Sequence, residues 1–189
     1  MRLFLFVFFI SLAPLFAQQK FEKEFRIKKS EAPTKALEFI KSVNLKNKLK
    51  WYAEESNDGK TYEVKTCFRK YKYSIEFSEN GKVLDIEKTI KLKQLEVLTQ
   101  QKIKQSLSKR FKKYKIKKLQ IQYIADENWI YKNLFQTENS HTKAKINYEL
   151  IVKGKTNKMF SQFEILINQE GEIIKELLFT SSNSLNLEF

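Results

Sequence analysis

The stretch YSIEFSENGKVLDIEK, residues 73–88, has the pattern of a β-hairpin. Its first half alternates apolar and polar side chains, which is the period of a strand with one buried face. The apolar positions are Tyr73, Ile75 and Phe77. Asn80 and Gly81 then offer two positions of positive φ, as a tight hairpin turn requires. In the predicted return strand, Asp85 and Glu87 face out towards solvent.

The stretch FEILINQEGEIIKELL, residues 163–178, repeats this pattern without a gap, and Gly171 takes the place of Gly81. Earlier strand-like stretches also correspond: TYEVKTCF (61–68) with NYELIVKG (147–154), and LKWYA (49–53) with LQIQY (119–123). Chance similarity between amphipathic hairpins is the alternative explanation. The agreement of several strands in the same order favours an internal duplication.

A helical pattern precedes each set of strands. In the first, Pro33 suits the opening turn, because its missing N–H is not needed there. In the second, Thr99 is a suitable N-cap. Apolar residues at helical spacing follow each start: Leu37, Ile40 and Val43 in the first, and Ile103, Leu107, Phe111 and Tyr114 in the second.

The sequence therefore predicts an α+β fold made of two tandem repeats, each with one helix packed on a four-stranded antiparallel meander sheet. We place the first repeat at residues 30–96 and the second at residues 97–180. Residues 18–29 are expected to be an N-terminal arm or an edge strand, and residues 181–189 a C-terminal tail.

The first residues, MRLFLFVFFISLAPLFAQQK, have the layout of a secretory signal peptide, with cleavage expected after Ala17. A retained membrane anchor is the alternative, but the apolar run is short for a bilayer. Loss of residues 1–17, whose only charged side chain is Arg2, lowers the formal net charge from +14 to +13. We expect a periplasmic or secreted protein that attracts polyanions.

A helix followed by a four-stranded meander, duplicated after a signal peptide, resembles the PepSY-like domains of exported bacterial proteins. The β-lactamase-inhibitory protein is similar in design. The resemblance covers residues 30–92 and 97–180, and the two hairpins with Gly81 and Gly171 at their turns carry it. It implies a non-catalytic domain that binds or inhibits another protein, often in the periplasm. No inhibitory residue carries over, because no local motif matches.

The second repeat is longer than the first by about sixteen residues, which we place near residues 124–140 (IADENWIYKNLFQTENS). Trp129, Tyr131 and Phe135 in this insert are candidate partner-binding residues, since exposed rings on a loop are typical binding anchors. The alternative is a long hairpin in which Trp129 and Tyr131 alternate as in a strand and pack on the sheet.

Residues 102–118, KIKQSLSKRFKKYKIKK, contain nine basic residues and no acidic one. Read as a helix, this segment places basic side chains on the solvent face. The candidate polyanion-binding residues are Lys109, Arg110, Lys112 and Lys113. Such a surface suits an anionic polymer or an anionic membrane, and an ordinary solvated face is the alternative. No nucleic-acid motif appears, so we expect no sequence-specific nucleic-acid binding.

The sequence shows no catalytic constellation. His141 is the only histidine and Cys67 the only cysteine, and neither has a visible helper nearby. Asp126 and Glu127 alone are too few ligands for a metal. We expect no enzyme, no metal and no cofactor. The expected function is an exported non-catalytic binding protein that inhibits or modulates an envelope or secreted protein, through its concave sheet faces or the insert. The alternative is a polyanion or envelope-surface binder that acts through the basic second helix.

Overall fold

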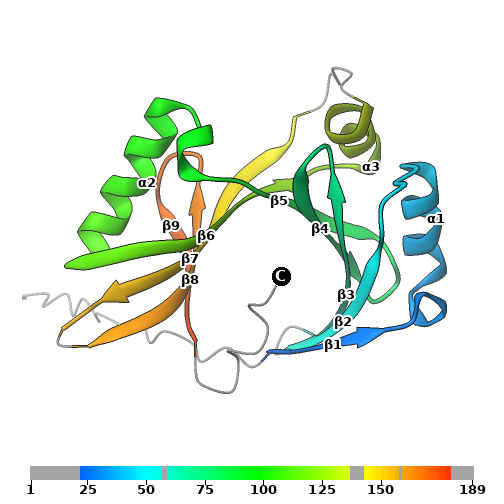
Figure 1. Cartoon of the computed structure of the whole chain (residues 1–189), viewed down its shortest axis with the longest axis horizontal. Helices are drawn as coiled ribbons and strands as arrows, with labels where there is room; N and C mark the ends of the chain where they lie inside the picture. Colours follow the sequence, from blue (N-terminus) through cyan, green and yellow to red (C-terminus); the bar gives the residue numbers. More distant parts are fainter. Residues whose placement is uncertain (1–21, 57–58, 137–142, 158, 180–189) are drawn as a thin grey trace, which may run out of the picture.

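A computed structural model describes residues 22–56, 59–136, 143–157 and 159–179. In this part of the chain, nine antiparallel strands form one sheet in sequence order (Figure 1). The strands are β1 (Glu22–Ile27), β2 (Lys50–Ser56), β3 (Gly59–Phe68), β4 (Tyr71–Ser78), β5 (Val83–Thr89), β6 (Lys113–Ile124), β7 (Lys145–Lys155), β8 (Phe160–Asn168) and β9 (Ile173–Leu178).

The prediction of two separate four-stranded sheets is wrong. β5 pairs with β6, with Ile86 opposite Tyr123 and Thr89 opposite Gln120. This pairing satisfies the backbone groups of two strands that would otherwise be exposed sheet edges. It joins the strands on either side into a single sheet, and β1 extends that sheet by pairing with β2.

The sheet is strongly curved, and its helices lie on the outer, convex side (Figure 1). They are α1 (Thr34–Ser42), α2 (Val97–Arg110) and the short α3 (Glu127–Ile130), which continues into the π-helical turn η3 (Tyr131–Gln136). Two 3₁₀ turns, η1 (Lys29–Glu31) and η2 (Leu92–Gln94), precede α1 and α2. In the described residues, the inner side of the curve carries no helix.

The two predicted hairpins are confirmed, and their turns have the same construction. Gly81 and Gly171 have φ of 81° and 93° and donate their N–H groups to the carbonyls of Ser78 and Asn168. The helices pack directly over these turns: a Cβ at Gly81 would lie 2.9 Å from the backbone N of Ala36. Glycine is therefore needed at position 81 for both conformation and space.

One detail of the hairpin prediction is wrong, because Asn80 does not have positive φ. The two-residue turn with positive φ at both positions joins β3 to β4 instead, at Arg69 and Lys70 (φ 47° and 72°). This is the conformation of a type I′ hairpin, which Asn and Gly usually adopt. The turn after Ser78 closes with glycine alone in the left-handed region.

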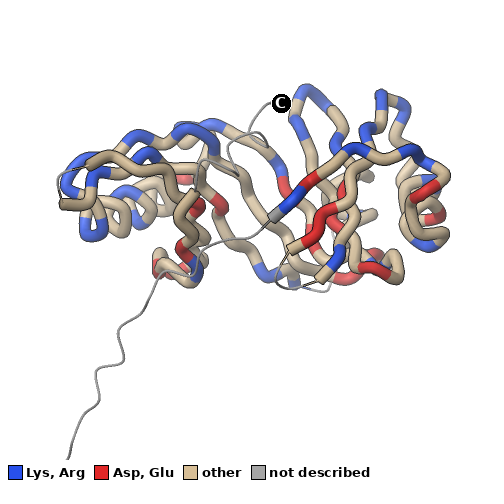
Figure 2. Tube along the Cα trace, turned by 90° about the horizontal axis from the view of Figure 1, so that it is seen from below, with Lys and Arg blue, Asp and Glu red and all other residues tan. Residues whose placement is uncertain are grey.

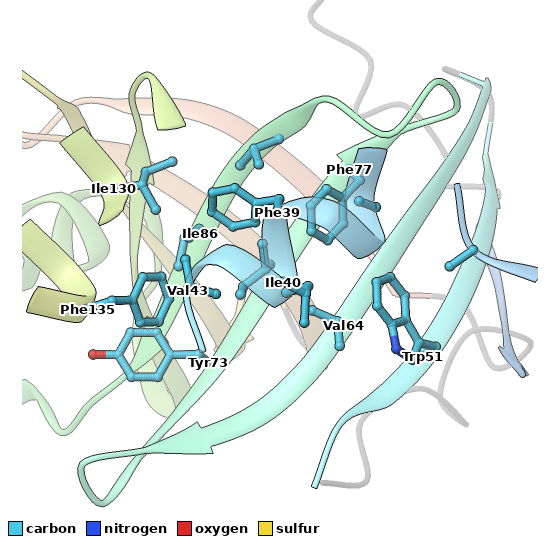
Figure 3. Close-up of a cluster of buried hydrophobic side chains, with 14 residues drawn as sticks. Phe39, Ile40, Val43, Trp51, Val64, Tyr73, Phe77, Ile86, Ile130 and Phe135 are labelled. Carbon is cyan, nitrogen blue, oxygen red and sulfur yellow. The ribbon is translucent and has the colours of Figure 1, made fainter. Parts of the chain in front are cut away.

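The helices bury two hydrophobic clusters on the outer face. The first cluster packs α1 against β2–β5, and Phe39 and Trp51 both contact Phe77 with ring centroids 6.0 Å apart (Figure 3). The second packs α2 against β6–β9, where Ile103 and Leu107 are fully buried.

The second helix begins and ends earlier than predicted. It starts at Val97, with Glu96 rather than Thr99 at the N-cap, and ends at Arg110. Phe111 has an extended backbone, and Tyr114 belongs to β6. Phe111 leaves the helix to stack against Phe163 at a centroid distance of 5.0 Å. Its ring occupies the space above Gly154, where a Cβ would lie 2.5 Å from two ring atoms.

We expect Gly154→Ala to lower the free energy of unfolding by about 1–3 kcal/mol, because the added methyl group overlaps the Phe111 ring in a packed core. Urea unfolding followed by circular dichroism measures this change. The control is Ser161→Ala on the paired position of β8, which should change stability by less than about 0.5 kcal/mol. Equal stability of both variants would show that Phe111 does not pack on Gly154.

Candidate functional site

The strand register places like charges opposite one another on the inner face. Glu63, Glu76 and Asp85 form one row across β3, β4 and β5, because Glu76 is the direct partner of both others. Like charges directly opposite in a sheet are destabilising. Such breaches of folding rules concentrate at functional sites, so we take this face as the candidate site.

A network of carboxylates and amides crosses the centre of the inner face, where β5, β6 and β7 lie side by side. We call it the inner-face network, and it comprises Asp85, Glu87, Gln120, Gln122, Asn147 and Glu149. Gln122 donates its Nε2 to Asp85 Oδ2 at 2.9 Å, and Asn147 donates its Nδ2 to Gln122 Oε1 at 2.9 Å. Gln120 donates its Nε2 to Glu87 Oε2 at 2.8 Å.

Three oxygens of this network are buried without a hydrogen-bond donor: Asp85 Oδ1, Gln120 Oε1 and Asn147 Oδ1. Gln120 and Asn147 are each 1% exposed, and Asp85 is 7% exposed. A buried acceptor without a donor costs about 1–3 kcal/mol. The network therefore has spare capacity to accept hydrogen bonds, and a ligand group with donors would use it.

Burial and mutual repulsion raise the pKa of the inner-face carboxyl groups. Burial, followed by the charges of Asp85, Glu54 and Glu63, raises the pKa of Glu76 to about 8. Burial and the charge of Glu149 raise the pKa of Asp85 to about 7, although the hydrogen bond from Gln122 opposes this shift. Burial also raises the pKa of Glu87, with Glu149 as the second cause. A positive charge placed here would oppose these shifts.

Next to the row of carboxylates, on β1 and β3, the inner face already shows how it holds a cation. Lys65 Nζ lies 2.6 Å from Glu24 Oε1 and 3.1 Å from Glu63 Oε2. All three side chains are mostly buried. An ammonium group is thus accommodated between carboxylates of β1 and β3, which lie on either side of β2.

Figure 2 shows basic residues along the whole molecule, whereas acidic residues are unevenly distributed. Lys and Arg predominate at the left-hand end, where α2 and β6–β9 lie, and acidic residues gather towards the middle and the right. The inner-face carboxylates lie close enough to raise one another's pKa, although the protein as a whole is strongly basic. In the described residues, no group of three or more His, Cys, Asp or Glu side chains is arranged to hold a metal ion.

Between the end of β6 and residue 136, the described part of the insert is helical and does not form a strand. Asp126 caps α3 by accepting a hydrogen bond from the backbone N of Trp129 at 2.8 Å. The short helix lies against the first hydrophobic cluster, and Ile130 and Phe135 are buried in it (Figure 3). Phe135 contacts Phe68 and Tyr73 at centroid distances of 5.5 and 6.0 Å.

Phe135 is therefore a core residue, only 6% exposed, and not an exposed aromatic side chain. Trp129 and Tyr131 are partly buried and pack against the same cluster, and Trp129 also contacts Tyr123 at 5.9 Å. These two keep some exposed surface, and their role in partner binding stays a prediction.

The four predicted polyanion-binding residues do not share one helix face. Lys109 is exposed near the end of α2, Lys112 lies in the connection and Lys113 begins β6. Arg110 instead makes a bidentate ion pair with Glu176 on β9, with N–O distances of 2.7 and 2.6 Å. This carboxylate raises the pKa of Arg110, and the guanidinium also lies over the rings of Phe111 and Phe163.

Cys67 is exposed and forms no disulfide. His141, the signal segment 1–17 and the tail 181–189 lie outside the described residues. In the described part of the chain, no helix is long and apolar enough to cross a membrane.

The sequence interpretation missed the inner-face network because it placed Asp85 and Glu87 towards solvent. They do lie on the face opposite the helices, but Asp85 is only 7% exposed there. One signal was present: amides and carboxylates recur at a period of two in β6 and β7, at Gln120, Gln122, Asn147 and Glu149.

The fold and this face together define a class of protein, in which an open, curved antiparallel sheet carries helices outside and polar side chains inside. No family model matches the chain, and no curated protein matches it significantly. A similar solved structure is that of a DUF2874 family protein from Bacteroides ovatus, with a TM-score of 0.50 and 12% identity. The match covers 78% of this chain and 89% of that chain. At this identity the likeness concerns the fold alone.

The raised pKa values predict that the protein loses stability as the pH rises. Glu76 has a folded-state pKa of about 8, well above the unfolded value near 4.5. The folded protein therefore binds more protons than the unfolded chain between these values, and the free energy of unfolding falls across that interval. Glu76→Gln should remove at least about 1.4 kcal/mol of this fall, the value of one pKa unit.

Urea unfolding between about pH 4.5 and pH 9 tests this pH dependence. The matched control is Glu170→Gln, at an exposed position of the β8–β9 turn, which should leave the wild-type slope in place. The same slope in Glu76→Gln and wild type would mean that Glu76 ionises at its ordinary pKa.

The position of the insert gives a second prediction. Phe135→Ala should cost about 3–5 kcal/mol, because it leaves a cavity between Phe68 and Tyr73. The same substitution at Phe160, which is 50% exposed at the start of β8, should cost less than about 1 kcal/mol. Thermal unfolding of the two variants compares them directly. Equal losses would contradict the burial of the insert.

Proposed function

We propose that this protein is a non-catalytic binding protein that recognises a protein partner through the inner face of its curved sheet. The observation that carries the proposal is the set of three buried acceptor oxygens without donors in the inner-face network. These oxygens, left without donors, contribute nothing favourable to the free energy of folding. A bound group with N–H donors would satisfy them, and this gain is specific to the complex.

The chemistry of the face favours a cationic group on the partner. Glu87 accepts a hydrogen bond from Gln120, and Glu149 lies opposite Gln120 on β7. Burial and the charge of Glu149 raise the pKa of Glu87, although the charge of Lys118 opposes this shift. A guanidinium or ammonium group would supply both donors and charge. Lys65, held between Glu24 and Glu63, is an internal example of such binding.

The setting proposed for this activity is the bacterial envelope or the extracellular space. The layout of residues 1–17 and the resemblance to PepSY-like domains support it. Within that setting, the partner would be an envelope or secreted protein, and the role that of an inhibitor or modulator. The helices lie on the opposite, convex side of the sheet (Figure 1).

The probe for this site is a short arginine peptide amide, because a protein with a formal net charge of +14 would repel a cationic peptide unless a local acidic site binds it. We expect saturable shifts of the side-chain amide NMR signals of Gln120, Gln122 and Asn147 during titration. The double variant Glu87→Gln/Glu149→Gln should weaken binding by roughly tenfold or more, as expected for loss of charge-assisted hydrogen bonds.

The matched control is Glu170→Gln/Glu172→Gln, which removes the same charge from the exposed β8–β9 turn. Binding should survive in this control. If the peptide bound equally weakly to wild type and to both variants, the inner face would not be a cation-accepting site. A partner isolated from envelope extract should likewise be captured by the control and lost from the inner-face variant.

A further inference from the structure

The register of β6 and β7 creates a second conflict of charge, far along the sheet from the inner-face network. Lys113 lies directly opposite Lys155, and Lys115 lies directly opposite Lys153. These four lysines share the inner face, and in the part of the chain that the structure describes none of them has an ion-pair partner. Two adjacent like-charge pairs cost stability, so a bound anionic surface would relieve them.

Exposed apolar side chains adjoin these lysines where β8 begins. Met159 is 76% exposed and Phe160 is 50% exposed. Phe160 is the direct cross-strand partner of Lys155. The Nζ atoms of Lys153 and Lys155 lie 5.6 and 5.7 Å from the centre of its ring. The fold therefore sets the Phe160 ring beside two ammonium groups, and the exposed Met159 precedes it in the chain.

The same end of the molecule also carries the exposed lysines of the α2–β6 connection. The backbone N of Lys112 donates to the carbonyl of Lys155 at 3.1 Å, which fixes this connection beside the end of β7. Lys112 is exposed, as is Lys109 one turn of chain earlier. We call this surface the basic tip: Lys109, Lys112, Lys113, Lys115, Lys153, Lys155, Met159 and Phe160.

The exposed side chains of Met159 and Phe160 favour an anionic bilayer over a soluble polyanion as the ligand. A soluble polyanion would be held by the lysines alone, and it would gain little from an exposed methionine. At a bilayer surface, by contrast, apolar side chains enter the boundary between headgroups and acyl chains while lysines contact the anionic headgroups. An exposed Met and Phe surrounded by lysines suit that arrangement.

We propose that the basic tip docks this protein on an anionic lipid bilayer, with Met159 and Phe160 inserted and the surrounding lysines on the headgroups. This surface lies at the end of the sheet, whereas the inner-face network lies at its centre. The proposed membrane contact therefore uses none of the residues of the inner-face network.

Vesicle co-sedimentation tests this assignment. The protein is produced without residues 1–17, because their apolar run would itself bind lipid and every described element begins at Glu22 or later. Vesicles of phosphatidylcholine alone are compared with vesicles that contain phosphatidylglycerol in about equal amount, at low and at high salt. We expect binding to the anionic vesicles only, weakened by salt.

Two double variants separate the contributions of charge and apolar surface. Lys153→Gln/Lys155→Gln should reduce the partition coefficient more than tenfold, since each lysine near an anionic surface contributes roughly fivefold. Met159→Ser/Phe160→Ser should reduce it by a similar factor and should also remove the part of binding that survives high salt.

Matched controls use the same substitutions elsewhere. Lys41→Gln/Lys82→Gln removes two exposed lysines from the first half of the chain, and Val97→Ser/Leu98→Ser removes two exposed apolar side chains from the start of α2. Both controls should bind like wild type. Loss of binding in a control equal to that in a tip variant would overturn the site.

Two further outcomes would overturn the choice of ligand. If Met159→Ser/Phe160→Ser bound vesicles as wild type while the lysine variant did not, the tip would be a site for soluble polyanions. Binding to heparin in solution measures that alternative. If wild type failed to bind anionic vesicles at low salt, the tip would not be a lipid-binding surface at all. Circular dichroism of every variant confirms that the fold is retained.

Discussion

The pairing of β5 with β6 is the interaction on which the rest of this structure depends. Its register joins only Ile86, Glu87, Lys88 and Thr89 to four residues of β6, yet it turns two sets of strands into one curved sheet. The same register sets Gln120 and Gln122 beside Glu87 and Asp85. Without it, the inner-face network would have no amides from β6, and its carboxylates would lie at a sheet edge.

The two faces of the sheet obey different physical rules. On the outer face, hydrophobic clusters and close contacts such as Phe111 over Gly154 supply the stability. On the inner face, the register opposes carboxylate to carboxylate at its centre and lysine to lysine at one end. The outer face provides enough stability to tolerate these repulsions, which leaves the inner face free to be complementary to other molecules.

The local parts of this fold could be predicted from the sequence, and the parts that depend on tertiary contacts could not. The hairpins around Gly81 and Gly171 follow from alternation and turn residues within a few positions. The end of α2 could not be predicted, because the sequence around Phe111 is compatible with both a helix and a strand. Its contacts with Phe163 and Gly154, which form only in the folded protein, select the extended backbone. The single sheet and the burial of Asp85 arise from strand edges that meet only after folding. The helix in the insert could not be predicted for a similar reason. Trp129 and Tyr131 alternate as in a strand, but the cap at Asp126 starts a helix.

The insert also determines when the first half of the protein becomes complete. Phe135 closes the cluster around Phe68 and Tyr73, and Arg69 donates to its carbonyl across sixty-six positions of sequence. A chain growing from its N-terminus therefore exposes this part of its first core until α3 has been synthesised. The two halves are in this respect a single folding unit: the later half supplies the cover of the earlier one, and a break between them would leave an apolar surface that neither piece could bury.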